Sequence, residues 1–249
     1  MHFTCPRLGA ISFATAALTA LLCASAIAQD ATKGPLPAPT SLKAEETALI
    51  LVDFQANFTS PDGAHYVKFK DFYAKTHMLD RTVELVKQAR AKGIWVIHVT
   101  EGYSQDYREI DTANPGFFHR GQLLRQAWKI GSKEAAYYEP LKPGPDDKDL
   151  FLPPRIQVSG FGGTGLNEIL RSKGIKNVAI GGFTSDVCVY ATILSAYDMG
   201  YHVYALKDAT VGFFTEMGAE MVQNVYPMWS SVKTNEQLLA MIESKRAEK

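Results

Sequence analysis

The stretch TALILVD at residues 47–53 is an unbroken, largely apolar run that ends in an aspartate. Three more runs of this kind follow along the chain: IWVIHV at 94–99, VAIGG at 178–182 and HVYAL at 202–206. Apolar runs without polar alternation are typical of strands that are buried on both faces of a parallel sheet. The sequence therefore predicts a parallel sheet with the run at 47–52 as one of its central strands.

The segments between these runs have a helical pattern of apolar residues. Each ends directly before a glycine, the residue expected just past a helix: residues 79–92, 164–173 and 186–199. Alternating strands and helices indicate an α/β fold with three layers, a doubly wound, mainly parallel sheet with helices on both faces. Residues 101–153 break the alternation with aromatic residues and prolines. We interpret them as an insertion that covers either a ligand-binding site or a subunit interface.

The first 28 residues have the layout of a secretory signal peptide. Positive charge lies within Met1–Arg7, an uncharged apolar run follows at 8–24, and Ala26-Ile27-Ala28 is a small-x-small cleavage pattern. A membrane anchor is the alternative, but the run is rich in Ala and Thr and short for a bilayer. A lipoprotein anchor at Cys23 is disfavoured by the bulky Leu22 before it. We expect a periplasmic or secreted protein with no membrane contact after cleavage.

After the predicted cleavage site, residues 29–46 are rich in proline, alanine and polar residues and are predicted to be a flexible lead-in. The folded domain is then expected to occupy residues 47–249. Of the 249 residues, 46% are hydrophobic and 21% charged, and the formal net charge is zero. This balance, with scattered basic residues, argues against a nucleic-acid partner. Cleavage would leave Cys188 as the single thiol, so no internal disulfide is possible.

Two residues stand where ligands bind in open α/β sheets, outside the carboxyl ends of strands. Asp53 follows the first run and is either a functional carboxylate or a structural cap. Cys188 falls in the first turn of the helix after the third run, with Thr184 or Ser185 as the expected cap. A helix N-terminus lowers the pKa of a thiol, and its free amides can hold an oxyanion. The alternative is a small, inert cysteine packed under the helix.

Three segments resemble the signature segments of the isochorismatase-like cysteine hydrolases: ALILVDFQ at 48–55, GFGGTGL at 160–166 and GGFTSDVCV at 181–189. The resemblance covers roughly residues 45–240. It implies a cysteine-dependent amidohydrolase that cleaves a C–N bond of a small-molecule amide or ureide through a Cys188 thioester. The family includes amidases acting on nicotinamide, N-carbamoyl amino acids, biuret and ureidoacrylates, as well as isochorismatase. No cofactor is implied, and a homo-oligomer is expected by analogy.

The resemblance also implies a triad of Asp, Lys and Cys. Asp53 and Cys188 match two members, but the lysine position, four residues before Ser159-Gly160-Phe161, holds Arg155. Arginine keeps the positive charge, cannot release a proton near neutral pH and needs more room for its planar fork. We expect Arg155 to act as a fixed cation in an active site with altered substrate preference. The alternative is that a lysine of the insertion, Lys142 or Lys148, reaches the site.

Further roles follow from the same resemblance. It implies an oxyanion site at the N–H groups of Thr184 and Cys188 and a strained, often cis, peptide between Phe183 and Thr184. The residues expected to bind substrate are Phe54, Gln55, Phe58, Phe161 and Thr184.

We predict no catalytic metal, because residues 98–103 lack the paired histidines of the nicotinamidase branch. His98 and His202 are expected in strands, as hydrogen-bonded core groups. Two other functions stay open at this point: isochorismatase-type cleavage of a vinyl ether, which does not require the cysteine, and a pseudoenzyme that binds a small molecule. An inactive Cys188→Ala variant would favour the amidase.

Overall fold

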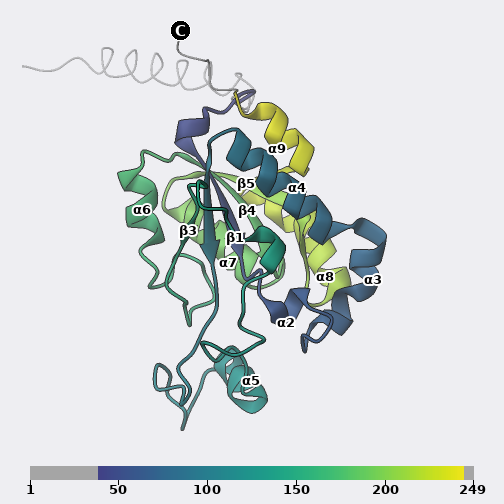
Figure 1. The fold of residues 1–249 in the computed structure, drawn as a ribbon, viewed down its shortest axis with the longest axis vertical. Coiled ribbons are helices and arrows are strands. Elements are labelled where there is room, and N and C mark those ends of the chain that lie inside the picture. Colours follow the sequence, from purple (N-terminus) through teal and green to yellow (C-terminus); the bar gives the residue numbers. More distant parts are fainter. Residues whose placement is uncertain (1–38, 244–249) are drawn as a thin grey trace, which may run out of the picture. The chain divides into compact units, whose positions relative to one another are not determined.

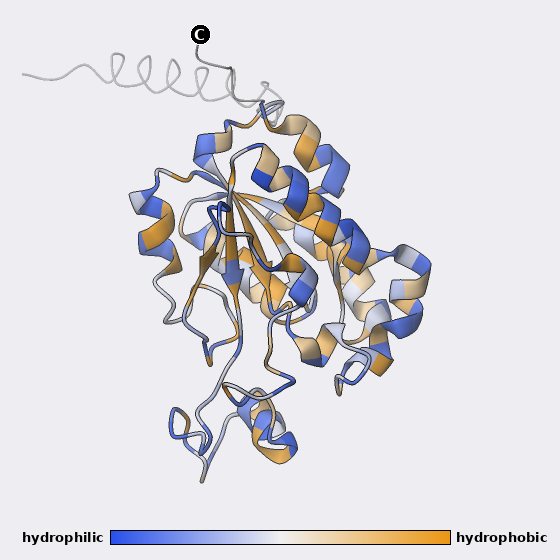
Figure 2. Cartoon of the chain, in the orientation of Figure 1, coloured by the Kyte–Doolittle hydropathy of each residue, from blue (hydrophilic) through white to orange (hydrophobic). Residues whose placement is uncertain are grey.

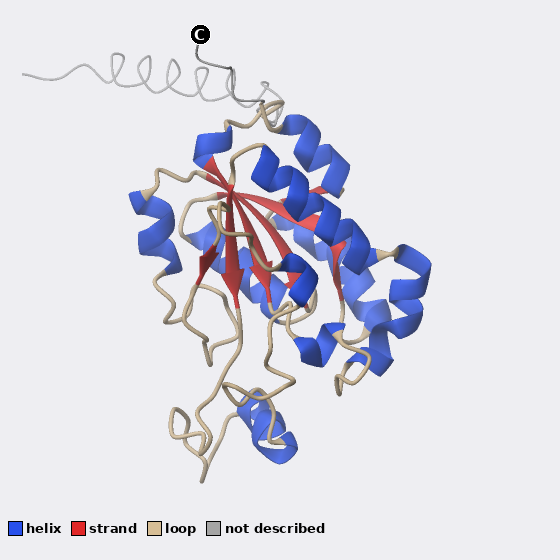
Figure 3. Ribbon diagram, viewed as in Figure 1, coloured by secondary structure: helices blue, strands red, loops and turns tan. Residues whose placement is uncertain are grey.

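The computed structural model describes residues 39–243, and the predicted signal peptide lies outside them. Within this range the chain forms one six-stranded sheet with the order β3-β2-β1-β4-β5-β6, and every neighbouring pair is parallel. Figure 3 shows the strands side by side with helices around them. The strands are β1 (Thr47–Val52), β2 (Trp95–Val99), β3 (Leu150–Phe151), β4 (Asn177–Phe183), β5 (His202–Val211) and β6 (Ser231–Lys233). The predicted doubly wound α/β architecture is confirmed.

Helices connect the strands and cover the sheet (Figure 1). The α-helices are α2 (Ala56–Thr59), α3 (Tyr66–Thr76), α4 (Met78–Ala91), α5 (Phe117–Arg125), α6 (Leu166–Ser172), α7 (Cys188–Asp198), α8 (Thr215–Glu220) and α9 (Asn235–Met241). Shorter turns of helix are η1 (Ala44–Glu46), η2 (Glu139–Leu141), η3 (Met221–Val225) and η4 (Tyr226–Met228). The three helices expected from the sequence, α4, α6 and α7, agree with the prediction to within two residues at each end. The glycines that follow them have φ between 68° and 78°, a backbone conformation that favours glycine.

The packing around strand β1 explains why its sequence has no polar alternation. Leu49 and Leu51 face a core that contains buried side chains of α3, α4 and α9. Ala48, Ile50 and Val52 face a second core, which contains side chains of α6 and α7. Both faces of the strand are therefore covered, and all six residues are buried. Figure 2 shows the central strands as the most hydrophobic part of the ribbon.

The insertion is held to the sheet by a buried polar cluster. Nδ1 of His98 in β2 lies 2.5 Å from the Tyr137 hydroxyl, and its Nε2 lies 2.6 Å from Oδ2 of Asp149. Arg90 of α4 donates to the same carboxylate at 2.7 Å. Both ring nitrogens of His98 are therefore satisfied, as expected for a core histidine. The contacts join two parts of the insertion to β2 and α4, while α5 lies beyond the carboxyl ends of the strands (Figure 3).

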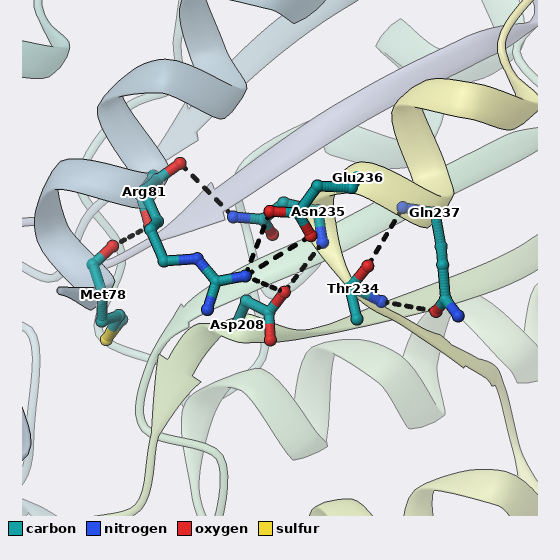
Figure 4. A network of polar contacts seen from close by, with 8 residues as sticks. Met78, Arg81, Asp208, Thr234, Asn235, Glu236 and Gln237 are labelled. Carbon is teal, nitrogen blue, oxygen red and sulfur yellow. Dashed lines mark hydrogen bonds and ion pairs between the residues drawn. The ribbon is translucent and has the colours of Figure 1, made fainter. Parts of the chain in front are cut away.

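A second polar cluster fixes the C-terminal helix (Figure 4). Nη2 of Arg81 in α4 lies 2.6 Å from Oδ2 of Asp208 in β5 and 3.2 Å from Oε1 of Glu236 in α9. The backbone N–H of Asn235 donates to the same Asp208 oxygen at 3.1 Å. One arginine thus connects a helix, a strand and the last helix of the described chain.

The ordered domain begins before the predicted start at residue 47. Leu42 exchanges backbone hydrogen bonds with Met241 (2.7 Å) and Glu243 (2.9 Å), and its side chain is buried. Ala44 is buried too, in the short turn η1. The prediction of a flexible lead-in was therefore wrong for residues 41–46, because two apolar side chains there complete the core. No helix between residues 39 and 243 is long and apolar enough to cross a membrane.

Candidate active site

Four ionisable side chains meet at the carboxyl edge of the sheet. Asp53 follows β1, Glu101 follows β2, Arg155 lies four residues after β3, and Cys188 lies five residues after β4. These are adjacent strands in the order β3-β2-β1-β4, so the topology brings the four residues together from distant parts of the sequence. The structure thus brings Asp53, Arg155 and Cys188 to one place and adds Glu101, which the sequence analysis did not select.

Asp53 is held by its backbone and by one cation. Its φ of 56° lies in the left-handed region, which aspartate tolerates better than most residues. Its N–H donates to the Val99 carbonyl at 2.8 Å. Oδ2 accepts a hydrogen bond from Nη2 of Arg155 at 2.9 Å, whereas Oδ1 has no partner among the described residues. Asp53 therefore keeps one carboxylate oxygen available for chemistry.

The end of β4 packs unusually close to the end of β1. A Cβ on Gly182 would lie 2.0 Å from the Val52 carbonyl oxygen, and Gly182 has a φ of 133°. Only glycine fits this position. The close approach brings the segment that leads to Cys188 next to Asp53.

Arg155, which stands at the sequence position of the family lysine, lies beside Asp53 in the structure. Its N–H donates to the Thr100 carbonyl at 2.9 Å, and its carbonyl accepts from Gly102 at 3.0 Å. The side chain points to Asp53, and its Nε and Nη1 atoms have no partner among the described residues. The two insertion lysines considered as alternatives, Lys142 and Lys148, are exposed, so that alternative is wrong. Arg155 is the cation of the site.

Cys188 is the first residue of α7 and is only 6% exposed. The expected side-chain cap from Thr184 or Ser185 is wrong: Val187 is the N-cap, without a side-chain hydrogen bond. Instead, the Thr184 carbonyl accepts from the N–H groups of Val187 and Val189, both at 3.1 Å. The N–H groups of Thr184 and Cys188 have no acceptor among the described residues, which leaves them available to an oxyanion. The Phe183–Thr184 peptide is cis, as the family resemblance implied.

Burial determines the acid strengths in the site. It raises the pKa of the Cys188 thiol well above its usual value, and the nearby Asp53 carboxylate raises it further. The expected lowering of this pKa was therefore wrong, because the sequence showed the helix end but not the burial or the neighbouring acids. Burial also raises the pKa of Asp53, against the opposing charge of Arg155. The shift at Cys188 favours a neutral thiol in the resting site, and the charge of Arg155 is what opposes protonation of the buried Asp53.

Glu101 is a buried acid of the site that the sequence analysis did not select. Its side chain is buried, and its carboxylate accepts a hydrogen bond from the Tyr103 hydroxyl at 3.0 Å. Burial and the neighbouring Asp53 raise the pKa of Glu101 to about 8. The available signal was its place just after the apolar run at 94–99, which parallels Asp53 after the run at 47–52.

The structure corrects two of the predicted substrate contacts. Phe54 is fully buried in the core, with its ring 5.1 Å from that of Phe183. Gln55 uses its side chain inside the protein: Nε2 donates to the carbonyls of Glu101 (2.9 Å) and Ala135 (3.0 Å), and Oε1 accepts from the Glu101 N–H (2.9 Å). Neither residue is free to bind substrate, and Gln55 positions Glu101 instead.

The other predicted contacts lie at different depths. Phe58 is buried and stacks on Phe183 at 4.8 Å, so it belongs to the aromatic layer next to the cis peptide. Phe161 is half-buried beside Tyr201, with ring centroids 6.0 Å apart. Thr184 is buried between β4 and α7, where its N–H group lies at the proposed oxyanion position.

Two hydrogen-bonded contacts hold the loop that leads to Cys188. Asp186 accepts from the backbone N–H groups of Phe213 and Phe214, both at 2.8 Å, and so joins this loop to the end of β5. On the other side, Thr192 of α7 accepts from the Gly160 N–H at 2.8 Å. A Cβ on Gly160 would lie 3.3 Å from the Thr192 side chain, so glycine permits this close packing.

The ionisable groups of the site are shielded from solvent. Asp53 is 1% exposed and Arg155 2% exposed. A cavity of about 500 Å³ lies between β5, β6 and α8 with Ser185 on its wall, but none of the four ionisable side chains of the site lines it. Among residues 39–243 no cluster of three or more His, Cys, Asp or Glu side chains is arranged to hold a metal ion. The groups available for chemistry are a buried thiol, two carboxyl groups and a guanidinium.

A buried cysteine at a helix N-terminus, beside an aspartate–cation pair at the carboxyl edge of a doubly wound sheet, defines a cysteine hydrolase of the α/β class. The isochorismatase domain profile matches residues 47–237, and the chain belongs to the isochorismatase family. The resemblance noted from the three sequence segments is confirmed, and the chain is a hydrolase of this family.

Similar proteins agree with this assignment. The chain is 30% identical over 197 residues to the ureidoacrylate amidohydrolase RutB of Azorhizobium caulinodans, covering 75% of this chain and 84% of that protein. It is 28% identical over 192 residues to RutB of Rhizobium rhizogenes, covering 73% and 77%. Among solved structures, a cysteine hydrolase from Pseudomonas syringae has a TM-score of 0.66 at 21% identity, covering 84% and 97%. N-carbamoylsarcosine amidase from Thermoplasma acidophilum has a TM-score of 0.58 at 20% identity, covering 77% and 97%.

Proposed function

We propose that the chain hydrolyses a carbon–nitrogen bond of a small amide or ureide through a thioester on Cys188. The observation that carries the proposal is the meeting of a buried thiol, a carboxylate with one free oxygen and a fixed cation at one edge of the sheet. The names of the similar proteins, an amidohydrolase and an amidase, support the same bond type.

The first half of the reaction forms the thioester. Oδ1 of Asp53 accepts the thiol proton while the Cys188 sulfur attacks the carbonyl carbon. The carbonyl oxygen becomes an oxyanion, which the N–H groups of Thr184 and Cys188 hold. When the tetrahedral intermediate collapses, the C–N bond breaks and Asp53 returns the proton to the departing nitrogen. Ammonia or an amine leaves, and the acyl group stays on sulfur.

The second half regenerates the enzyme. Asp53 accepts a proton from water as its oxygen attacks the thioester carbon, and the same two N–H groups hold the new oxyanion. The C–S bond then breaks, the acid product leaves, and the proton on Asp53 returns to sulfur. Arg155 stays charged throughout and keeps Oδ2 of Asp53 in place.

The test uses two variants and one matched control. Purified protein is screened for ammonia release from small amides and ureides, and the best substrate is then given to Cys188→Ala and Asp53→Asn. Both variants are expected to lose at least about a thousandfold in kcat/KM, because each lacks a group that the acylation step uses. Asp198→Asn, the same substitution as Asp53→Asn at an exposed position on α7, should keep full activity. Ammonia release that survives in Cys188→Ala would contradict the thioester, whereas hydrolysis of a vinyl ether by that variant, without amide turnover in the unmodified protein, would favour isochorismatase-type chemistry. Ligand binding without turnover in the unmodified protein would favour a pseudoenzyme.

Export is the proposed location of this activity, to the periplasm or the medium, supported by the signal-peptide layout of residues 1–28. The burial of Cys188 would protect the single remaining thiol in an oxidising compartment. N-terminal sequencing of the exported chain should begin at Gln29. A homo-oligomer is proposed as well, supported by the exposed apolar face of α5, where Phe117 is 95% exposed. Sedimentation velocity would test it, and a monomer at micromolar concentration would contradict it.

A further inference from the structure

The active site contains more acids than cations. Asp53, Glu101 and the Cys188 thiol are three groups that become negative on losing a proton, and Arg155 is the one cation that pairs with any of them among residues 39–243. All four side chains are almost inaccessible to water. A buried charge without a partner is unfavourable, and with one guanidinium a second negative charge would leave the buried site with a net negative charge.

Glu101 cannot leave the site to ionise in water. The side chain of Gln55 holds its backbone on both sides, through the Glu101 N–H and carbonyl, each at 2.9 Å. The main chain of Glu101 also pairs with that of Arg155 in an isolated bridge. Its carboxyl group meets the hydroxyl of Tyr103, which is itself fully buried. The group is therefore fixed next to the reacting residues and forms no ion pair of its own within the described chain.

Because position 155 holds an arginine, the charge of the site depends more strongly on the protonation of Glu101. A lysine in a buried site can lose its proton when the charge around it changes, whereas an arginine cannot. The cation of this site is thus constant, and any change in charge falls on the acids. The charged and titratable groups that interact with Glu101 come from five parts of the fold: Asp53 after β1, Tyr103 and Tyr107 after β2, Arg125 of α5, Arg155 after β3 and Cys188 of α7.

We propose that Glu101 is a positioning residue that must remain protonated for the reaction, and that its ionisation switches the site off by placing a second carboxylate beside Asp53 and Arg155. The inference rests on the proposed amidase chemistry, since it concerns the proton that Asp53 takes from Cys188. When Glu101 is neutral, the charge of Arg155 stabilises Asp53 alone, and Asp53 can accept the thiol proton. With Glu101 ionised, the added negative charge disfavours both the thiolate and the oxyanion.

We therefore expect activity to fall at alkaline pH, and the group whose ionisation causes the fall is the carboxylic acid of Glu101. Because the pKa of Glu101 is raised to about 8, the wild-type kcat/KM should fall about tenfold for each pH unit above that value. The isosteric variant Glu101→Gln cannot ionise, so its kcat/KM should change less than about threefold between pH 8 and pH 9.5. Glu109→Gln is the matched control, because Glu109 is an exposed acid of the same insertion. It should keep the wild-type profile.

A second variant tests the direction of the effect. Tyr103→Phe removes the hydroxyl that donates to the Glu101 carboxylate, which stabilises the ionised form. Ionisation of Glu101 becomes harder, so the alkaline fall should move to higher pH. A purely structural role for Tyr103 would lower the rate at every pH and leave the midpoint of the fall unchanged.

A measurement that needs no substrate separates this inference from the proposed function. The iodoacetamide alkylation rate of Cys188, followed by mass spectrometry of its peptide, reports the thiolate directly. At pH 9 the rate should be about tenfold higher in Glu101→Gln than in the wild type, because one like charge is gone. That result without turnover of any amide would contradict the proposed function and support the role of Glu101. Alkylation profiles that coincide in the two proteins would overturn the inference, whether or not Glu101→Gln is active.

Discussion

Replacing Arg155 by methionine removes the cation that pairs with Asp53 and leaves a carboxylate in a closed site. The side chains of Arg155 and Asp53 are each 1% exposed, and Nη2 and Oδ2 lie 2.9 Å apart. Methionine is long and apolar, so it fills much of the space without replacing the charge. Water cannot take the place of the guanidinium at a group this deeply buried, and the carboxylate is expected to protonate.

The loss of stability in Arg155→Met can be worked out from the free-energy cost of keeping Asp53 protonated in the folded protein. Asp53 in the unfolded chain has a pKa of about 3.9, so keeping it protonated at pH 7 costs about 1.4 kcal/mol for each of roughly three pH units, or about 4 kcal/mol. A raised pKa in the folded state means that the folded protein binds more protons than the unfolded one. Stability therefore falls as pH rises between the two pKa values. Because the raised pKa of Asp53 means that the wild type already bears part of this cost, we expect Arg155→Met to lose up to about 4 kcal/mol at pH 7 and at most about 1.5 kcal/mol at pH 5.

Urea unfolding followed by tryptophan fluorescence at pH 5, 6 and 7 measures this difference. Arg155→Lys is the matched control, because it keeps a cation and should stay within about 1 kcal/mol of the wild type at every pH. The double variant Asp53→Asn, Arg155→Met has no charge to bury and should regain most of the loss.

Two results would refute the reasoning. A deficit in Arg155→Met that is the same at pH 5 and pH 7 would mean that lost packing, not an unpaired carboxylate, is the cause. A deficit below about 1 kcal/mol at pH 7 would mean that Asp53 is already protonated in the wild type and does not depend on Arg155.

Two further substitutions test the scaffold. Gly182→Ala should destabilise the fold by more than about 3 kcal/mol and reduce soluble yield, because its Cβ would lie 2.0 Å from the Val52 carbonyl oxygen; thermal unfolding that is unchanged would contradict this. Asp149→Asn should cost about 2–4 kcal/mol near pH 7, because Arg90 and His98 both bond to that carboxylate. These partners lower the pKa of Asp149, so the stability it contributes is present above pH 4 and lost below it. The difference between wild type and variant, measured by urea unfolding, should therefore shrink in acid; a difference that is constant down to pH 3 would argue against the charge.

The central strands were predictable because burial on both faces leaves an unbroken apolar pattern. Strands β1 and β4 have this pattern, and glycines mark the ends of three helices. Strands β3 and β6 were missed because two or three residues at a sheet edge carry too little pattern to recognise. Their pairing depends on neighbouring strands that are distant in sequence.

The candidate site was predictable where a residue follows a strand or matches a family segment. Asp53, Arg155 and Cys188 were found in this way. The properties that depend on three-dimensional neighbours were not. The sequence shows the helix end that favours a thiolate at Cys188, but not the burial that outweighs it. It shows Gln55 beside Asp53, but not that the amide group is used to hold Glu101.

The contact between Arg155 and Asp53 explains how an arginine can stand in a lysine position without stopping the reaction. Arginine often grips a carboxylate with two parallel bonds, and such a fork would engage both oxygens of Asp53. Here only Nη2 reaches Oδ2, and Oδ1 has no partner within the described chain. The main chain of Arg155 is fixed by its bonds to Thr100 and Gly102, while Asp53 is fixed by its left-handed backbone. These constraints permit a single contact, so the cation positions the base and leaves the oxygen that must receive the thiol proton free.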